Sequence, residues 1–234
     1  MAATTDAVNT SNTSARQRRL RFALIYVLPP LVALAIVLLP TLSSAAILPR
    51  LSVGPGFGLT DQHGQFVTNE HLRGEIIVYS LATVDCNDAC AATLAALKNA
   101  RERAAQDIEP PLRFVTLVVD AGADPRALSD FAEAHGIASD DWSVLSGDEA
   151  AVRAVVSSGF EVYLGRTDDG SVTHGPGVFL VDHAGFMRAE YRTGTPSPSL
   201  VADDIGRIRV EANAGSVRGL FYDAAHALSL SCGV

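Results

Sequence analysis

Cys86 and Cys90 are the residues of this chain whose type and spacing most directly suggest chemistry. They lie in the stretch TVDCNDACAATL, where an apolar run gives way to a sequence typical of a helix. If residues 87–91 are helical, the two thiols lie one turn apart on one helix face. The free N–H groups and positive dipole of a helix start favour the thiolate and lower the cysteine pKa. The pair therefore predicts a reactive or metal-binding site.

Two thiolates in this position support two kinds of chemistry. As soft ligands they suit Cu(I), and a third donor, usually a histidine, would complete a trigonal site. Alternatively, the pair closes to a disulfide and exchanges with the thiols of another protein. The C-x-x-x-C spacing is wider than the C-x-x-C of dithiol oxidoreductases, so it leaves room for a metal and still permits the disulfide. Two small cysteines that only fill a core would fit this position poorly.

His174 lies in HGPGVFLVD, just before an apolar run typical of a strand. A lone histidine in that place is more often a surface or capping residue. The other histidines fit turns and helix surfaces: His63, His71, His135, His183 and His226.

The acidic residues near the cysteine pair have two interpretations. Asp88, Asp120 and Asp124 fit turn and helix-capping positions. Close to a thiolate site they would also tune the thiol pKa or contact a partner. Cys232 has no evident partner in the sequence, and we interpret it as a free thiol, with an intermolecular disulfide as the alternative.

The elements that must position these residues alternate between strand and helix. The stretches typical of strands are 75–82, 112–119, 178–181 and 186–191, and those typical of helices are 87–105, 124–135, 148–157 and 199–212. Residues 57–60 and 65–67 flank a turn signal, DQHG, and predict an N-terminal hairpin. This order predicts an α/β fold of the thioredoxin-like type, with a mixed central sheet flanked by helices and an added N-terminal hairpin.

The N-terminal region predicts a membrane anchor. No charged residue occurs from Phe22 to Leu48, and the basic stretch RQRRLR precedes this run. Its length and the positive-inside rule indicate one transmembrane helix over 22–46 and a cytoplasmic tail over 1–21. A cleaved signal peptide is the alternative. Either one places the globular part outside the cytoplasm, in a periplasmic or other extracytoplasmic space.

Composition divides the rest of the chain. Residues 47–55 (ILPRLSVGP) read as a linker, 56–212 as the globular domain, and 213–234 as a helical extension that packs on the domain or contacts a partner or membrane surface. The first 21 residues carry a net charge of +3 and the whole chain −8, so the remainder carries −11. Such an acidic domain argues against nucleic-acid binding, which requires a cationic surface.

Several further motifs accompany the cysteine pair: FGLTDQHGQFVTNEHLRGEIIVYSLA, Val119-Asp120 followed by Asp124, WSVLSG and HGPGVFLVD. In order and spacing they resemble the Sco/SenC family of copper chaperones for cytochrome c oxidase assembly, over residues 56–195. The resemblance implies a thioredoxin-like fold, an N-terminal membrane anchor, and copper, as Cu(I) or Cu(II), bound by Cys86, Cys90 and His174. It also implies delivery of copper to the binuclear copper site of cytochrome c oxidase subunit II, or reduction of the cysteines of that site.

Some positions depart from the family pattern. Asn87 and Ala91 follow the cysteines where the family usually has proline, and Val84 replaces an aromatic residue. Pro176 stands where redox thioredoxin-like proteins often carry a cis-proline before a strand. Two other functions therefore stay open. One is an extracytoplasmic thiol–disulfide oxidoreductase with the cysteine pair as its catalytic residues, and the other is a structural accessory subunit of a respiratory complex.

Overall fold

The computed structural model describes residues 26, 29–30, 48–104, 109–120 and 124–213. The chain forms two compact units, residues 1–46 and 47–234, and the second contains the cysteine pair and His174. The expected cytoplasmic tail lies outside the described residues, as do His226 and Cys232. So do the expected membrane anchor, apart from residues 26 and 29–30, and the C-terminal extension, apart from residue 213. Within the described part of the chain, no helix is long and apolar enough to cross a membrane.

An eight-stranded mixed sheet forms the centre of the domain, with the strand order β1-β10-β9-β4-β5-β6-β2-β3. Strands β4, β5 and β6 are parallel neighbours, and β9 joins β4 in the antiparallel direction. The strands of this sheet are β1 (Ser52–Val53), β2 (Gly58–Asp61), β3 (Phe66–Thr68), β4 (Ile76–Ala82), β5 (Leu112–Val118), β6 (Trp142–Ser146), β9 (Val178–Val181) and β10 (Phe186–Tyr191). A separate two-stranded sheet consists of β7 (Leu164–Arg166) and β8 (Val172–His174).

The central strands form where the sequence is continuously apolar. Every residue of β4 (IIVYSLA) is buried, and β5 (LRFVTLV) is buried except for the half-buried Arg113. Burial of both faces is typical of strands in the middle of a sheet that helices cover on both sides. Because β4 and β5 are parallel, their carboxyl ends lie at the same edge of the sheet. The segments that follow these two strands therefore meet there.

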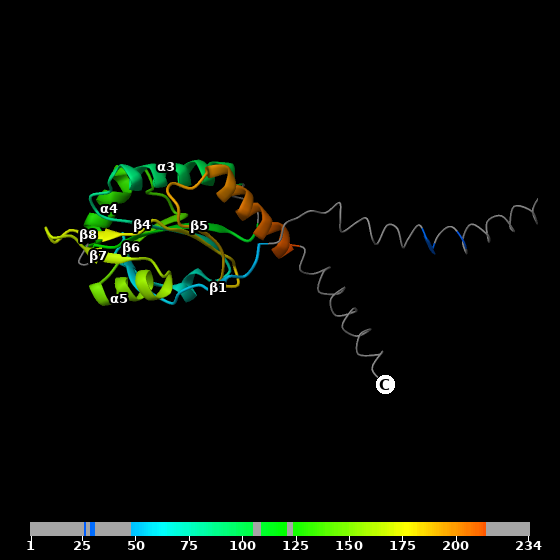
Figure 1. Cartoon of the computed structure of the whole chain (residues 1–234), viewed down its shortest axis with the longest axis horizontal. Coiled ribbons are helices and arrows are strands. Elements are labelled where there is room, and N and C mark those ends of the chain that lie inside the picture. Colours follow the sequence, from blue (N-terminus) through cyan, green and yellow to red (C-terminus); the bar gives the residue numbers. More distant parts are fainter. Residues whose placement is uncertain (1–25, 27–28, 31–47, 105–108, 121–123, 214–234) are drawn as a thin grey trace, which may run out of the picture. The chain divides into compact units, whose positions relative to one another are not determined.

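Helices cover both faces of the sheet (Figure 1). On one face, α3 (Asp88–Arg103), α4 (Pro125–Ala134) and the helix over residues 198–213 share one buried apolar cluster with the sheet. On the other face, α5 (Glu149–Arg153) continues into the π-helical turn η3 (Ala154–Gly159) and packs in a second cluster. A short 3-10 helix, η2 (Asn69–Leu72), connects β3 to β4.

The predicted mixed sheet with flanking helices and an N-terminal hairpin is confirmed. The hairpin is β2–β3, and it joins the sheet through β6. Helix α4 begins at Pro125 because the Asp124 side chain caps it and accepts a hydrogen bond from the Ala127 N–H. Sequence patterns did not predict β1, β6 or the β7–β8 pair as strands. The last of these has half-buried and exposed residues and so lacks an apolar run.

The segment read as a linker contributes to the edge of the sheet. Strand β1 pairs with β10, and the Arg188 guanidinium on β10 donates hydrogen bonds to the carbonyl oxygens of Leu48 and Pro49. The Arg188 side chain is only 2% exposed and forms an ion pair with Asp182, which is 1% exposed. The chain is therefore bound to the domain from residue 48 onward.

Candidate functional site

Cys86 and Cys90 are joined by a disulfide bond, with their Cα atoms 5.2 Å apart. They lie where the chain leaves the carboxyl end of β4 and enters α3. Asn87 between them is the N-cap of α3, and its side chain accepts a hydrogen bond from the Cys90 N–H at 3.0 Å. The prediction of two thiols on one helical face is therefore corrected. Cys86 precedes the cap, and only Cys90 belongs to the helix.

The two cysteines have different surroundings. Cys90 is buried in the apolar cluster under α3, whereas Cys86 is half-buried in the preceding loop. The backbone φ of Cys86 is +27°, a region that non-glycine residues seldom adopt. Cys86 is therefore the more accessible half of the disulfide. Because a thiolate attacks the sulfur atom that it can reach, we expect attack at Cys86.

His174 is the last residue of β8 and lines the same cavity as Cys90. The cavity has a volume of about 370 Å³ and also borders Thr83, Pro176 and Thr195. The Nδ1 atom of His174 lies 2.8 Å from the Gly175 carbonyl oxygen. Since a carbonyl only accepts hydrogen bonds, Nδ1 carries the proton of the neutral ring, and Nε2 keeps the lone pair that a metal ion requires.

Asp120 follows β5 and reaches the loop that leads to Cys86. Its Oδ2 atom accepts a hydrogen bond from the Val84 N–H at 3.2 Å, whereas Oδ1 is buried without a hydrogen-bond partner in the described part of the chain. Burial raises the pKa of the Asp120 carboxyl. The hydrogen bond from the Val84 N–H and the electrostatic influence of His174 and Arg166 oppose this rise, and the nearby Asp85 adds to it. Asp120 is thus a partly buried carboxyl whose charge has few hydrogen-bond donors, and it is close enough to His174 for the two side chains to interact electrostatically.

The other sequence candidates do not line this cavity. Asp124 caps α4, and Asp88 is an exposed residue in the first turn of α3. The described histidines outside the cavity wall are His63, His71, His135 and His183. Pro176 does line the cavity, and its peptide bond to Gly175 is trans.

The metal-binding capacity of the site depends on the state of the cysteines. Among the described residues, no three histidine, cysteine, aspartate or glutamate side chains lie close enough together to hold a metal ion. In a disulfide the two sulfur atoms are bonded to each other, and neither is a thiolate ligand. Reduction would release two sulfur donors, of which Cys90 lines the same cavity as His174. Two thiolates and an imidazole are a donor set that fits a soft metal ion such as Cu(I).

Two features of the site were not predicted. Asn87 was read only as a departure from a family pattern, although asparagine is a preferred N-cap residue and this signal was available. The threonines of the cavity wall come from separate segments of the chain and are Thr83, Thr93, Thr173 and Thr195. No local pattern in the sequence could have grouped them.

A family model described as SCO1/SenC matches residues 46–209. Similar solved structures include a copper-bound ScoI from Arabidopsis thaliana, which is 19% identical with a TM-score of 0.59, over 68% of this chain and 99% of that chain. An SCO1/SenC family lipoprotein from Bacillus anthracis is 21% identical with a TM-score of 0.60, over 68% and 97%. A copper-bound ScoI from Bradyrhizobium japonicum is 23% identical with a TM-score of 0.57, over 67% and 99%. No curated protein matches the chain.

At these identities the solved structures support the fold alone. The family model carries more weight, because its match extends over more than half of the chain and includes Cys86, Cys90 and His174. The predicted thioredoxin-like arrangement and the motifs quoted above agree with this match. The chain therefore belongs to the SCO1/SenC family.

Proposed function

We propose that this chain is a membrane-anchored copper chaperone that holds copper through the thiolates of Cys86 and Cys90 and the imidazole of His174. It passes the copper to the binuclear copper site of cytochrome c oxidase subunit II, or reduces the cysteines of that site. One observation carries the proposal. Cys90, which is joined to Cys86 at the start of α3, lines the same cavity as His174, in a chain of the SCO1/SenC family.

The donor set suits copper as a transported ion. Two thiolates are soft ligands that favour Cu(I), and the imidazole adds a donor that Cu(II) binds well. Proteins with the same fold from Arabidopsis thaliana, Bradyrhizobium japonicum and yeast have been solved with copper bound, which supports copper as the metal. Replacement of one thiolate ligand at a time by those of a partner would move the ion without releasing it to water.

Copper binding requires that the Cys86–Cys90 disulfide first be reduced. A dithiol partner would supply the two electrons: its thiols become a disulfide while two thiols form on this chain. Cys86 is the sulfur that the partner's thiolate would attack, because it is the more accessible one. A similar protein, BsSco, is described as a Sco family member with a disulfide switch, which supports a redox step of this kind.

The proposed location follows from the N-terminal sequence. An anchor over 22–46 with a basic cytoplasmic tail would place the domain on the outer side of the cell or inner membrane. The hydrogen bonds from Arg188 to Leu48 and Pro49 hold the chain on the domain from residue 48 onward.

The proposal is tested by titrating the reduced full-length chain, in detergent, with Cu(I) in competition with a chelator. We expect one tightly bound copper per chain, lost in Cys86→Ser and Cys90→Ser. His174→Ala should weaken Cu(II) more than Cu(I). His135→Ala and Cys232→Ser are matched controls that should leave both affinities unchanged. A Cys86→Ser/Cys90→Ser variant with the copper content of the unaltered chain would overturn the proposal.

A thiol–disulfide oxidoreductase is the second candidate function, favoured by the observed disulfide beside an open cavity. In this reaction the two thiols of the reduced chain become the Cys86–Cys90 disulfide, and a partner disulfide becomes two thiols. The activity would not require His174. Equal rates of disulfide reduction in His174→Ala and the unaltered chain, together with an absence of copper binding, would favour this function.

A further inference from the structure

Strand β8 has an open backbone edge. It pairs only with β7 among the described strands, with Val172 opposite Arg166 and His174 opposite Leu164. The Gly175 N–H donates to the Tyr163 carbonyl oxygen, and the Thr167 N–H donates to the Ser171 carbonyl oxygen. In an antiparallel pair, hydrogen-bonded positions alternate with non-bonded positions.

This alternation fixes which groups of β8 point toward β7. Thr173, opposite Gly165, is a hydrogen-bonded position, and Val172 and His174 are non-bonded positions. The N–H and C=O groups of Val172 and His174 therefore point away from β7. In the described part of the chain, no backbone hydrogen bond to another element uses them.

The open edge borders the site already described. Val172, Thr173 and His174 are half-buried, and all of them line the cavity that also borders Cys90 and Thr83. The cavity lies within the size range of sites that hold ligands or short peptide segments. A segment running along β8 would thus pass beside Cys90, one half of the disulfide.

The two edges of the large sheet offer no such site. Strand β3 forms the far edge of the large sheet, and its Thr68 N–H already donates to Nδ1 of His71. Strand β1 is only two residues long, and it lies at the other edge. Natural proteins usually keep an open strand edge short, charged or covered. Strand β8 is short, and it is the edge that borders the cavity of Cys90.

Acidic side chains surround this place. Asp85 and Asp88 are exposed on either side of Cys86 in the sequence, and Asp120 accepts a hydrogen bond from the Val84 N–H in the same loop. The nearby Arg166 side chain forms an ion pair with Glu149, which also pairs with Arg153, so this group carries one net positive charge against the three carboxylates. The negative charge selects for an occupant with basic residues.

We propose that β8 receives an extended, basic peptide segment of a protein partner as an added strand, so that the segment's cysteines come to lie over Cys86 and Cys90. The inference rests on the proposed function, since copper transfer or thiol exchange requires a partner's sulfur atoms at this place. Backbone hydrogen bonds to Val172 and His174 supply affinity, and the acidic surroundings supply selectivity. In an extended strand, residues four apart face the same side, so two cysteines at that spacing both face the site.

The test uses the oxidised full-length chain in detergent and a synthetic peptide of about nine residues, the length of a long natural strand. The peptide has lysine at both ends and serine in place of each cysteine, which prevents covalent exchange. We expect binding that weakens with added salt. A peptide N-methylated at alternate amides should bind at least about tenfold more weakly, because it cannot pair on that edge.

Two protein variants separate the backbone from the side chain at one position. Val172→Pro removes the outward N–H without removing a bond to β7, whereas Val172→Ala keeps the N–H and removes the side chain. We expect peptide binding to weaken at least about tenfold in Val172→Pro and to persist in Val172→Ala. Hydrogen exchange in the unaltered chain should slow at Val172 and His174 when the peptide binds, and stay unchanged at Thr173.

Equal binding of the N-methylated and unmodified peptides would overturn the inference, as would equal binding by the two Val172 variants or no binding by the unaltered chain. Cu(I) titration of Val172→Pro shows whether a loss of peptide binding is accompanied by a loss of copper binding, and so distinguishes a failure of this inference from a failure of the proposed function. Retained copper with lost peptide binding supports strand addition. Copper binding that is absent from the unaltered chain as well would count against the chaperone function instead.

Discussion

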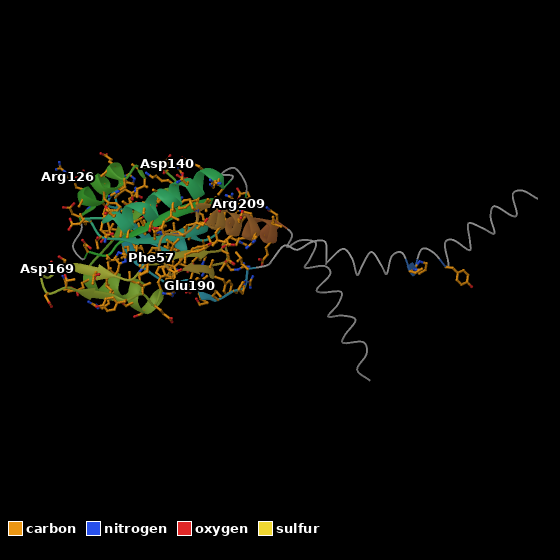
Figure 2. All side chains as sticks on the ribbon, turned by 45° about the horizontal axis from the view of Figure 1, so that its top comes forward. Phe57, Arg126, Asp140, Asp169, Glu190 and Arg209 are labelled. Atoms are coloured by element: carbon orange, nitrogen blue, oxygen red, sulfur yellow. A yellow bond between two sulfur atoms is a disulfide. The ribbon has the colours of Figure 1, made fainter. Side chains whose placement is uncertain are left out.

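The parallel strands β4, β5 and β6 carry different chemistry at their two ends. At their amino ends, which we call the ion-pair end, charges are matched: Glu75 with Arg113, Asp141 with Arg101, and Asp182 with Arg188. At their carboxyl ends, which we call the cysteine end, lie the Cys86–Cys90 disulfide, Asp120 and His174. In Figure 2, Asp169 at the tip of the β7–β8 hairpin and Arg209 of the last helix mark these opposite ends of the domain.

The difference concerns how well polar groups are satisfied. The Asp182 carboxylate accepts hydrogen bonds from the N–H groups of Ala184 and Phe186 and from the Arg188 guanidinium. The Asp120 carboxyl has one backbone donor and a buried oxygen without a hydrogen-bond partner in the described part of the chain. A polar network in which every group has a hydrogen-bond partner makes a structure rigid. Ionisable groups with shifted pKa values, by contrast, are common at functional sites.

The largest effect at the ion-pair end is expected for Arg188→Met. The substitution leaves the Asp182 carboxylate buried without its cation and frees the Leu48 carbonyl, so we expect a loss of about 3 kcal/mol in the free energy of unfolding. Urea denaturation of the full-length chain measures it. Cu(I) affinity should not change, because Arg188 is at the other end of the sheet.

Arg73→Met is the matched control for this prediction. Arg73 and Glu70 form an exposed ion pair, with side chains 59% and 62% exposed, and loss of such a pair should leave stability unchanged within error. An Arg188→Met variant as stable as Arg73→Met would mean that the buried pair does not hold the ion-pair end together.

A smaller effect is expected for Asp141→Asn. Burial alone would raise the pKa of Asp141, but hydrogen bonds from Arg101 and Ser139 outweigh it and lower the pKa below the usual 3.8. An acid with a lowered pKa in the folded state stabilises the fold above its unfolded pKa, and this stabilisation is lost as the pH falls. Because the pair is partly exposed, we expect a loss of about 1 kcal/mol at pH 7.

The pH dependence separates this account from a packing effect. The difference in unfolding free energy between Asp141→Asn and the unaltered chain should shrink as the pH is lowered through the acid range. Denaturation at several pH values measures it. A difference that stays constant down to the lowest pH would show that the charge of Asp141 does not contribute.

The sequence predicted the ion-pair end and the cysteine end to different extents. The buried strands β4 and β5 were predictable because their apolar runs are local signals, and so was the placement of Cys86 after the first of them. The charge pairs were not, since Arg101 and Asp141 come from segments that only the fold brings together. His174 was selected through a family resemblance, because the half-buried hairpin that carries it has no apolar pattern.

Removal of the helix cap at Asn87 should lower stability about as much as Asp141→Asn does. Unlike the loss of another helix cap, it should also affect the copper site. Asn87→Ala removes the acceptor of the Cys90 N–H, and Asp148→Ala removes the corresponding cap of α5. Each loss should destabilise the fold by about 1 kcal/mol. Only Asn87→Ala should also weaken Cu(I) binding, because Asn87 fixes the chain between the two sulfur atoms. Equal Cu(I) affinities of the two variants would contradict this.

The smallest effect is expected for Asp120→Asn, and its sign is opposite to that of Asp141→Asn. Burial raises the pKa of Asp120, so the folded chain retains this proton to a higher pH than the unfolded chain does. The contribution of Asp120 to stability is then present at low pH and lost as the pH rises through the raised pKa. The asparagine keeps an oxygen acceptor for the Val84 N–H and carries no charge.

We therefore expect Asp120→Asn to be slightly more stable than the unaltered chain at neutral pH, with the advantage disappearing as the pH falls below the raised pKa. Thermal denaturation of both chains across the acid range measures this difference. A variant that is less stable at neutral pH would mean that the ionised carboxylate is held by a partner, as at the ion-pair end. The contrast between the two ends of the sheet would then rest on the cysteine pair alone, because its acidic neighbour would be as well satisfied as Asp141.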